Sequence, residues 1–199
     1  VQEGLVTILS HGLTHLTTHI DEWLKAKDQY KDMRWFREFR EMKAKKPTTP
    51  ESIIDRMKKG RELLEKAFGR KPSIIVPSAH ETTAETTGMA KDAGFQFFSS
   101  KATVFLHNDQ KVVNRKLKGF FPEEIHKGTD LCKAGYPASF VFHDYDIRLN
   151  GTEWLEKHLN NFQEQGITNS PSLDVVLSLL TADIEIISEG NSINVSMKF

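Results

Sequence analysis

Short apolar runs alternate with longer segments of helical periodicity along the first half of the chain. The runs are rich in Ile, Val, Leu and Phe with few polar residues among them, as buried strands are; they cover residues 5–9, 73–76 and 95–99. The segments between them place apolar side chains three and four residues apart and predict helices at residues 50–68 and 84–93. This alternation of strand and helix predicts parallel strands joined by helical crossovers.

The ends of these two helices are marked by residues with specific conformational preferences. Thr49 can cap the first helix, and Pro50 suits its first position because proline has no N–H to leave unpaired. Gly69 is suited to end it, since glycine adopts the left-handed conformation without strain. Thr83 is the expected cap of the second helix, and Gly94 its end.

Residues 21–46 are rich in charge, with aromatic side chains scattered among good helix formers. Their spacing is roughly helical and predicts one or two solvated helices with an aromatic face on the core. The alternative is an excursion that faces a substrate, because insertions after a site strand often shape a cleft.

The second half of the chain is less regular. Further short strands are expected at residues 104–106, 111–113, 119–121 and 139–142. A loop with a short helix is expected at 122–136, a helix from Asn150 or Thr152 to Gly166, and a helix over 173–180 capped by Ser170-Pro171. Residues 184–187 and 193–195 predict a hairpin. We therefore expect one domain over residues 1–181, followed by a C-terminal β-hairpin or the start of a following segment at 182–199.

Composition excludes several classes of protein. The 199 residues carry 27 basic and 27 acidic side chains, so the electrostatic case for a nucleic-acid partner is absent. A single cysteine, Cys132, cannot form an internal disulfide. No apolar run approaches the roughly 20 residues of a membrane span, and no signal peptide is visible. The chain begins at Val1 rather than Met, so we expect a piece of a longer protein, and the compartment cannot be argued from a missing signal.

Polar residues follow three of the apolar runs where the strands would end. These clusters are Ser10-His11, residues 77–81 and His143-Asp144. Ligands in α/β folds gather at the carboxyl ends of strands, so a site is expected where the clusters meet.

The first cluster contains histidines at a regular spacing. His11 and His15 would lie on one face of a helix and could share a metal ion, for which neutral imidazole is a good ligand. His19 is the weakest candidate because it lies two turns from His11. The alternative is that these histidines are ordinary surface or core residues.

A family resemblance is carried by four elements in order: His-Gly-Leu-Thr-His at 11–15, Pro77-Ser78, Gly94-Phe95, and Phe-Val-Phe-His-Asp at 140–144. This order resembles the polysaccharide deacetylase (NodB-homology) family, and in particular divergent members with a glycine after the first histidine. The likeness covers most of residues 5–180. It implies an irregular, partial β/α barrel and a metal-dependent hydrolase that removes N-acetyl groups from a sugar polymer or glycan.

The resemblance also implies roles for individual residues. His11 and His15 would bind a divalent metal, with zinc the first expectation. His143 would be the general acid, and it would need a nearby carboxylate, Asp144 or Asp146, to favour its protonated form.

The loop after the second apolar run would supply the substrate contacts. Pro77 and Ser78 match the wall of the family's substrate groove, and His80 and Glu81 follow in the same loop. The partner would be a carbohydrate, and an extracellular or cell-envelope location follows from the resemblance alone.

The sequence departs from the family pattern at several positions. The family's two aspartates, base and third metal ligand, lie well upstream of the histidines, whereas the ten residues before His11 contain no Asp and only Glu3 as an acid. We expect the aspartate strand to lie outside this chain. Val76 replaces an expected arginine, and His80-Glu81 stand where Tyr or Phe and then Gly are common, which favours a different substrate. The alternatives are a non-catalytic metal- or carbohydrate-binding module and a structural domain with incidental histidines.

Overall fold

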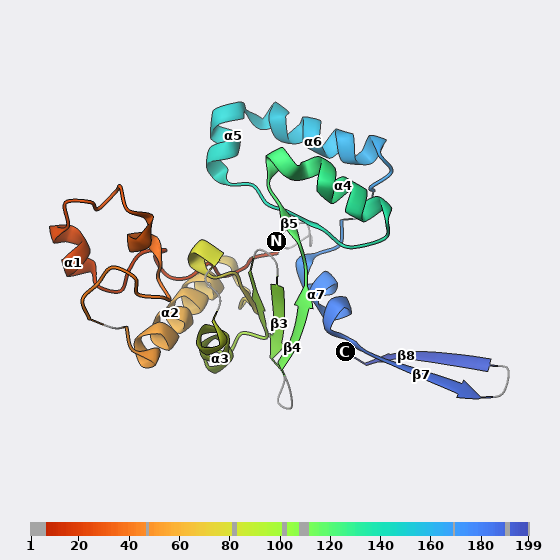
Figure 1. The fold of residues 1–199 in the computed structure, drawn as a ribbon, viewed down its shortest axis with the longest axis horizontal. Helices are drawn as coiled ribbons and strands as arrows, with labels where there is room; N and C mark the ends of the chain where they lie inside the picture. The colour runs from red at the N-terminus through yellow and green to blue at the C-terminus, as the bar shows by residue number, and fades with distance from the viewer. Residues whose placement is uncertain are drawn as a thin grey trace.

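A four-stranded mixed sheet, in the order β1-β2-β3-β4, forms the centre of the fold (Figure 1). The computed structural model describes residues 7–46, 48–80, 83–100, 103–107, 112–168, 170–189 and 192–198. It is a mixed α/β fold in which helix predominates over strand, so the predicted class is confirmed as mixed α/β.

The parallel part of the sheet is built from the first half of the chain. Strands β1 (Ile74–Ile75) and β2 (Phe97–Ser99) pair in parallel. On the other side of β1, Ser10 forms a parallel bridge, in which its N–H donates to Ile74 O at 3.0 Å and its carbonyl accepts from Val76 N at 2.8 Å. Helices α2 (Pro50–Phe68) and α3 (Ala84–Asp92) lie in the connections, so the predicted parallel strands with helical crossovers are confirmed here.

The rest of the sheet is antiparallel. β2 pairs with β3 (Thr103–His107), which pairs with β4 (Val112–Lys116). The connection at residues 108–111 is far shorter than the dozen or more residues that a parallel crossover needs. β5 (Gly119–Phe120) and β6 (Ser139–Phe140) form a separate parallel pair. Within the described ranges the strands therefore close no barrel.

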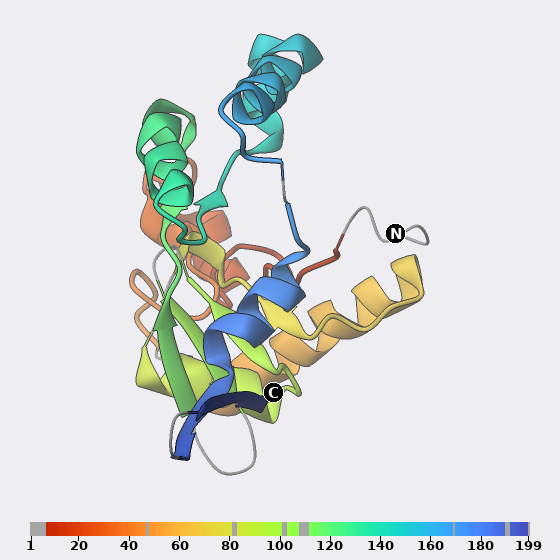
Figure 2. The same cartoon turned by 90° about the vertical axis from the view of Figure 1, so that its right-hand side faces the viewer.

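Consecutive strand residues pack on opposite faces of the sheet. Ile75 and Phe98 belong to a core with Met57 of α2, whereas Ile74 and Phe97 belong to a second core with Leu177 of α7 (Leu173–Thr181). In Figures 1 and 2, α2 and α3 accordingly lie on the opposite side of the sheet from α7. Coverage of both faces explains why the paired residues at 74–75 and 97–98 are consecutive apolar residues rather than alternating apolar and polar ones.

Capping fixes the helix ends where the sequence predicts them. Thr49 Oγ1 accepts from Ser52 N at 3.3 Å at the start of α2, and Gly69 ends that helix with φ 70°. Thr83 Oγ1 accepts from Thr86 N at 3.1 Å at the start of α3. These residues satisfy backbone groups that the helix itself leaves unpaired.

The prediction of helices at residues 21–46 is largely wrong. Helix there is confined to α1 (Ile20–Lys25) and a 3-10 turn, η1 (Met33–Phe36). Polar side chains hold the segment in an irregular path: Asp28 Oδ1 accepts from Trp35 Nε1 at 2.7 Å, and Asp32 Oδ1 accepts from the backbone N of Arg34 at 2.9 Å. Such bonds compete with helical backbone pairing. The aromatic contact with the core is confirmed, since Trp35 and Phe39 are buried.

The second half of the chain adds small helices and a hairpin. The helical elements are η3 (Pro122–Glu124), α4 (Ile125–Lys133), α5 (Asp144–Asn150) and α6 (Thr152–Glu164). α5 is absent from the sequence-based prediction, and α7 has Ser172, not Ser170, at its N-cap position, with no cap hydrogen bond from that side chain. The predicted hairpin is confirmed as β7 (Asp183–Glu189) and β8 (Ser192–Lys198), which extends away from the rest of the fold (Figure 1).

Candidate functional site

The first histidine cluster forms a loop directly after the Ser10 bridge, which we call the histidine loop (residues 11–15). It is not helical: Gly12 has φ 113° and His15 has φ 54°. The two imidazoles still meet, because the turn brings their ring centroids to 4.9 Å with the planes at 61°. The pair predicted from helical spacing is therefore formed by a loop with left-handed residues.

His11 is oriented by the neighbouring strand end. Its Nδ1 lies 2.7 Å from the carbonyl oxygen of Val76, the residue that follows β1. A carbonyl only accepts hydrogen bonds, so Nδ1 carries the proton and Nε2 keeps its lone pair. Metal-binding histidines are commonly held in this way, with one ring nitrogen donating to a carbonyl.

The surroundings of His11 disfavour its charged form. Burial lowers the pKa of His11, and the charges of His15 and, to a smaller extent, His143 lower it further, against the opposing effects of the Val76 hydrogen bond and of Glu38. His11 is thus neutral near pH 7, as a metal ligand must be.

This lowered pKa predicts a pH dependence of stability. Below the unfolded-state pKa of 6.5 the unfolded chain binds more protons at residue 11 than the folded protein does, so the free energy of unfolding falls as pH drops from 7 toward 5. We expect His11→Gln to reduce the difference between urea unfolding at pH 7.5 and at pH 5.5, measured with a chelator present. His126→Gln, at an exposed position of α4, should leave it unchanged. An equal pH response in wild type and His11→Gln would contradict the prediction.

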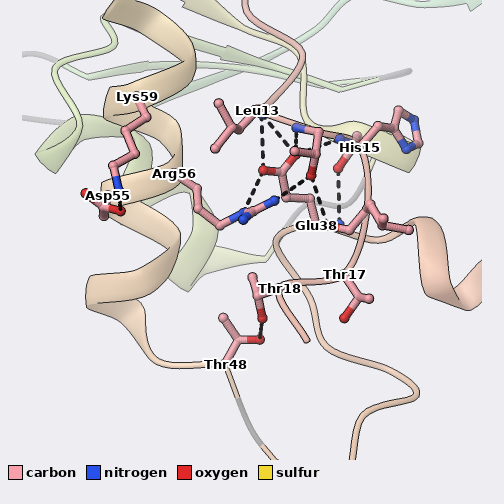
Figure 3. A network of polar contacts seen from close by, with 12 residues as sticks. Leu13, His15, Thr17, Thr18, Glu38, Thr48, Asp55, Arg56 and Lys59 are labelled. Atoms are coloured by element: carbon pink, nitrogen blue, oxygen red, sulfur yellow. Dashed lines mark hydrogen bonds and ion pairs between the residues drawn. The ribbon is translucent and has the colours of Figure 1, made fainter. Parts of the chain in front are cut away.

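A buried carboxylate, Glu38, organises the histidine loop (Figure 3). Its Oε2 accepts from the backbone N–H groups of Leu13, Thr14 and His15 at 3.0–3.1 Å. Its Oε1 accepts from Leu13 N at 3.1 Å and from Arg56 Nε at 2.9 Å. Sequence reasoning missed both Glu38 and Arg56, because each lies in a charged stretch that resembles a solvated surface.

One sequence signal points to this arrangement. Gly60 lies in the interior of the amphipathic helix α2, where glycine costs about 1 kcal/mol relative to alanine. A Cβ at Gly60 would lie 2.7 Å from the carbonyl oxygen of Gly12. The glycine therefore marks the place where α2 passes against the histidine loop.

His143 lies at the N-terminal end of α5. Its backbone N donates to Asp146 Oδ2 at 2.8 Å, and its ring Nδ1 lies 3.7 Å from the same oxygen. The ring stacks on Tyr145 at 4.8 Å and on Phe121 at 6.1 Å between centroids. Of the two carboxylates considered in the sequence, Asp146 is thus beside the imidazole, whereas Asp144 is exposed in the first turn of α5.

The predicted substrate loop follows β1. Pro77 and Ser78 are both buried, and Ser78 Oγ accepts from Glu38 N at 3.3 Å, so this side chain ties two loops together rather than facing solvent. His80 is half-buried with φ 53° in the 3-10 turn η2 (Ser78–His80). Glu81 lies outside the described residues.

His11 and His15 are the candidate metal ligands that the structure brings together. In the part of the chain that the structure describes, no three His, Cys, Asp or Glu side chains gather as a possible metal site. No helix among the described residues has the length and apolar character that a membrane span requires.

No family model matches this chain, and it has no significant match among curated proteins or solved structures. The function is therefore argued from the site.

Proposed function

We propose that this protein is a metal-dependent hydrolase that removes N-acetyl groups from a carbohydrate, in the manner of the polysaccharide deacetylases it resembles. The bridge at Ser10 with β1 and β2 would then correspond to part of that family's irregular β/α barrel. The observation that carries the proposal is the imidazole pair at the carboxyl end of parallel strands, with Nδ1 of His11 held by Val76 and Nε2 available.

The donor set fits a divalent ion such as zinc, for which imidazole nitrogen is a preferred ligand. His11 and His15 would hold it, and the bound ion would supply Lewis-acid activation of the N-acetyl carbonyl. His143 would donate a proton to the leaving amine, with the carboxylate of Asp146 beside the protonated ring and Asp144 as the second candidate. The buried Pro77 and Ser78 would hold the loop after β1 in place, and His80, which is only half-buried, would be its contact with substrate.

Metal binding is the first test. We expect the metal-free protein to bind Zn²⁺ in isothermal titration calorimetry, and the His11→Ala, His15→Ala double variant to bind it at least tenfold more weakly, because both imidazoles are lost. The matched control is His126→Ala, which removes an exposed imidazole from α4. Equal binding by wild type and double variant would count against the site.

Activity separates the enzyme from its main alternative. With zinc present, the enzyme should release acetate from N-acetylglucosamine oligomers, and His143→Ala should reduce the release while leaving zinc affinity unchanged. A non-catalytic metal- or carbohydrate-binding module is the second candidate, favoured by the two-ligand set of the described residues. Zinc binding without acetate release would support that module.

A further inference from the structure

We propose that Glu38 is the positioning residue of this metal centre: its carboxylate holds the histidine loop in the conformation that lets His11 and His15 share one ion. The inference rests on the proposed function, since it assigns Glu38 a task at the same site. Its basis is the set of contacts between one buried carboxylate and three successive backbone amides.

The conformation of His15 needs such support. Its φ of 54° is uncommon for a residue with a side chain and costs on the order of 1 kcal/mol or more. The N–H of His15 donates to Glu38 Oε2 at 3.0 Å, and the N–H of Thr14 donates to the same oxygen at 3.1 Å. The carboxylate thus offsets the strain at the residue whose ring must face His11.

A carboxylate is the group that this position requires. The Glu38 side chain is fully buried, and both of its oxygens accept: Oε2 from three amides, and Oε1 from Leu13 N and Arg56 Nε. A glutamine has nearly the same shape but carries N–H donors in place of one oxygen. In either orientation it would set donors against donors, either at Arg56 or at the loop amides, and a buried unpaired donor is costly.

The packing around the carboxylate leaves the loop little room to move. A Cβ at Gly12 would collide with Oε2 of Glu38, so the loop accepts the carboxylate only where residue 12 is glycine. The Glu38 backbone N donates to Ser78 Oγ at 3.3 Å, which ties the segment that carries Glu38 to the loop after β1. The same residue therefore connects the metal-binding loop and the candidate substrate loop.

The test is a Co²⁺ titration of the 199-residue protein and its Glu38→Gln variant. We expect Glu38→Gln to bind Co²⁺ about 10- to 100-fold more weakly, the range for the loss of groups that orient metal ligands. We also expect altered visible d–d absorption of the bound ion, because His15 is displaced. If Glu38 were a purely structural residue, its substitution would lower the denaturant concentration at the unfolding midpoint, but the Co²⁺ spectrum of the protein that is still folded would be unchanged.

Glu41→Gln is the matched control. Glu41 also accepts hydrogen bonds, from Thr17 Oγ1 at 2.8 Å and from Ala44 N at 3.1 Å, and its Oε2 lies 3.9 Å from His19 Nε2, but none of these contacts reaches residues 13–15. It should leave Co²⁺ affinity and spectrum as in wild type. If Glu38→Gln does not fold, Glu38→Asp serves instead, since it keeps the charge but shortens the reach toward the amides.

The outcomes distinguish the two proposals. Wild-type protein that binds no Co²⁺ would overturn the metal site and with it the role of Glu38. Wild-type binding that persists unchanged in the Glu38 variant would overturn the role of Glu38 alone. Weaker binding with an altered spectrum in that variant, and neither change in Glu41→Gln, would establish it.

Discussion

Replacing Arg56 with methionine is expected to lower the free energy of unfolding by about 3–5 kcal/mol, the usual cost of removing one partner of a buried ion pair. Arg56 Nε lies 2.9 Å from Oε1 of Glu38, whose side chain is fully buried, and the arginine side chain itself is only 15% exposed. In the variant, the amides of the histidine loop would still donate to the Glu38 carboxylate, but they carry no formal positive charge, so the buried negative charge would lose its ion-pair partner.

Urea unfolding followed by circular dichroism measures this loss. Lys59→Met is the matched control. Lys59 lies on α2, as Arg56 does, and its Nζ pairs with Asp55 Oδ2 at 2.7 Å, but both of these side chains are more than half exposed (Figure 3). Such an exposed pair contributes little, and its loss should change stability by about 0.5 kcal/mol or less. Equal losses for Arg56→Met and Lys59→Met would show that the burial of the Glu38 pair has no energetic importance.

Phe98→Ala is expected to destabilise the protein by a similar amount, about 3–5 kcal/mol, for a different reason. Phe98 is fully buried on β2, in the core with Met57 and Ala90, and its ring centroid lies 6.2 Å from that of Phe105. Removing the ring leaves a cavity between α2, α3 and the sheet that the surrounding side chains fill only in part.

The same unfolding measurement tests this prediction. Phe68→Ala removes the same ring from the last turn of α2, where Phe68 is 46% exposed. It should lower the free energy of unfolding clearly less than Phe98→Ala does. If the two variants lose the same stability, the face of the sheet that α2 and α3 cover is not the main core of the protein.

The parts of the fold predicted from sequence are those governed by local signals. The bounds of α2 follow from Thr49, Pro50 and Gly69, whose preferences act within a few residues. The paired strands of the first half follow from apolar runs that are buried on both faces. The presence of His11 and His15 side by side was also predicted, although their expected helical spacing was not the reason.

The parts that sequence missed depend on contacts between distant segments. Glu38 serves the histidine loop from more than twenty residues away, and nothing in its charged surroundings distinguishes it from a solvated residue. The prediction of helix was wrong over most of residues 21–46. There, Asp28 accepts a hydrogen bond from the Trp35 side chain and Asp32 accepts one from the backbone of Arg34, and these bonds hold the segment in an irregular path. The antiparallel pair β3–β4 ended the parallel pattern, and with it the expected barrel.

The close approach of Gly12, Gly60 and Glu38 links three positions that are far apart in the sequence. A Cβ at residue 12 would meet the carboxylate of Glu38, and a Cβ at residue 60 would meet the backbone carbonyl of residue 12, so both positions are closed to larger residues while the loop keeps this path. In related chains that keep an acidic residue at 38, position 12 should therefore remain glycine, because a side chain there would meet the carboxylate and would also be strained at a φ of 113°.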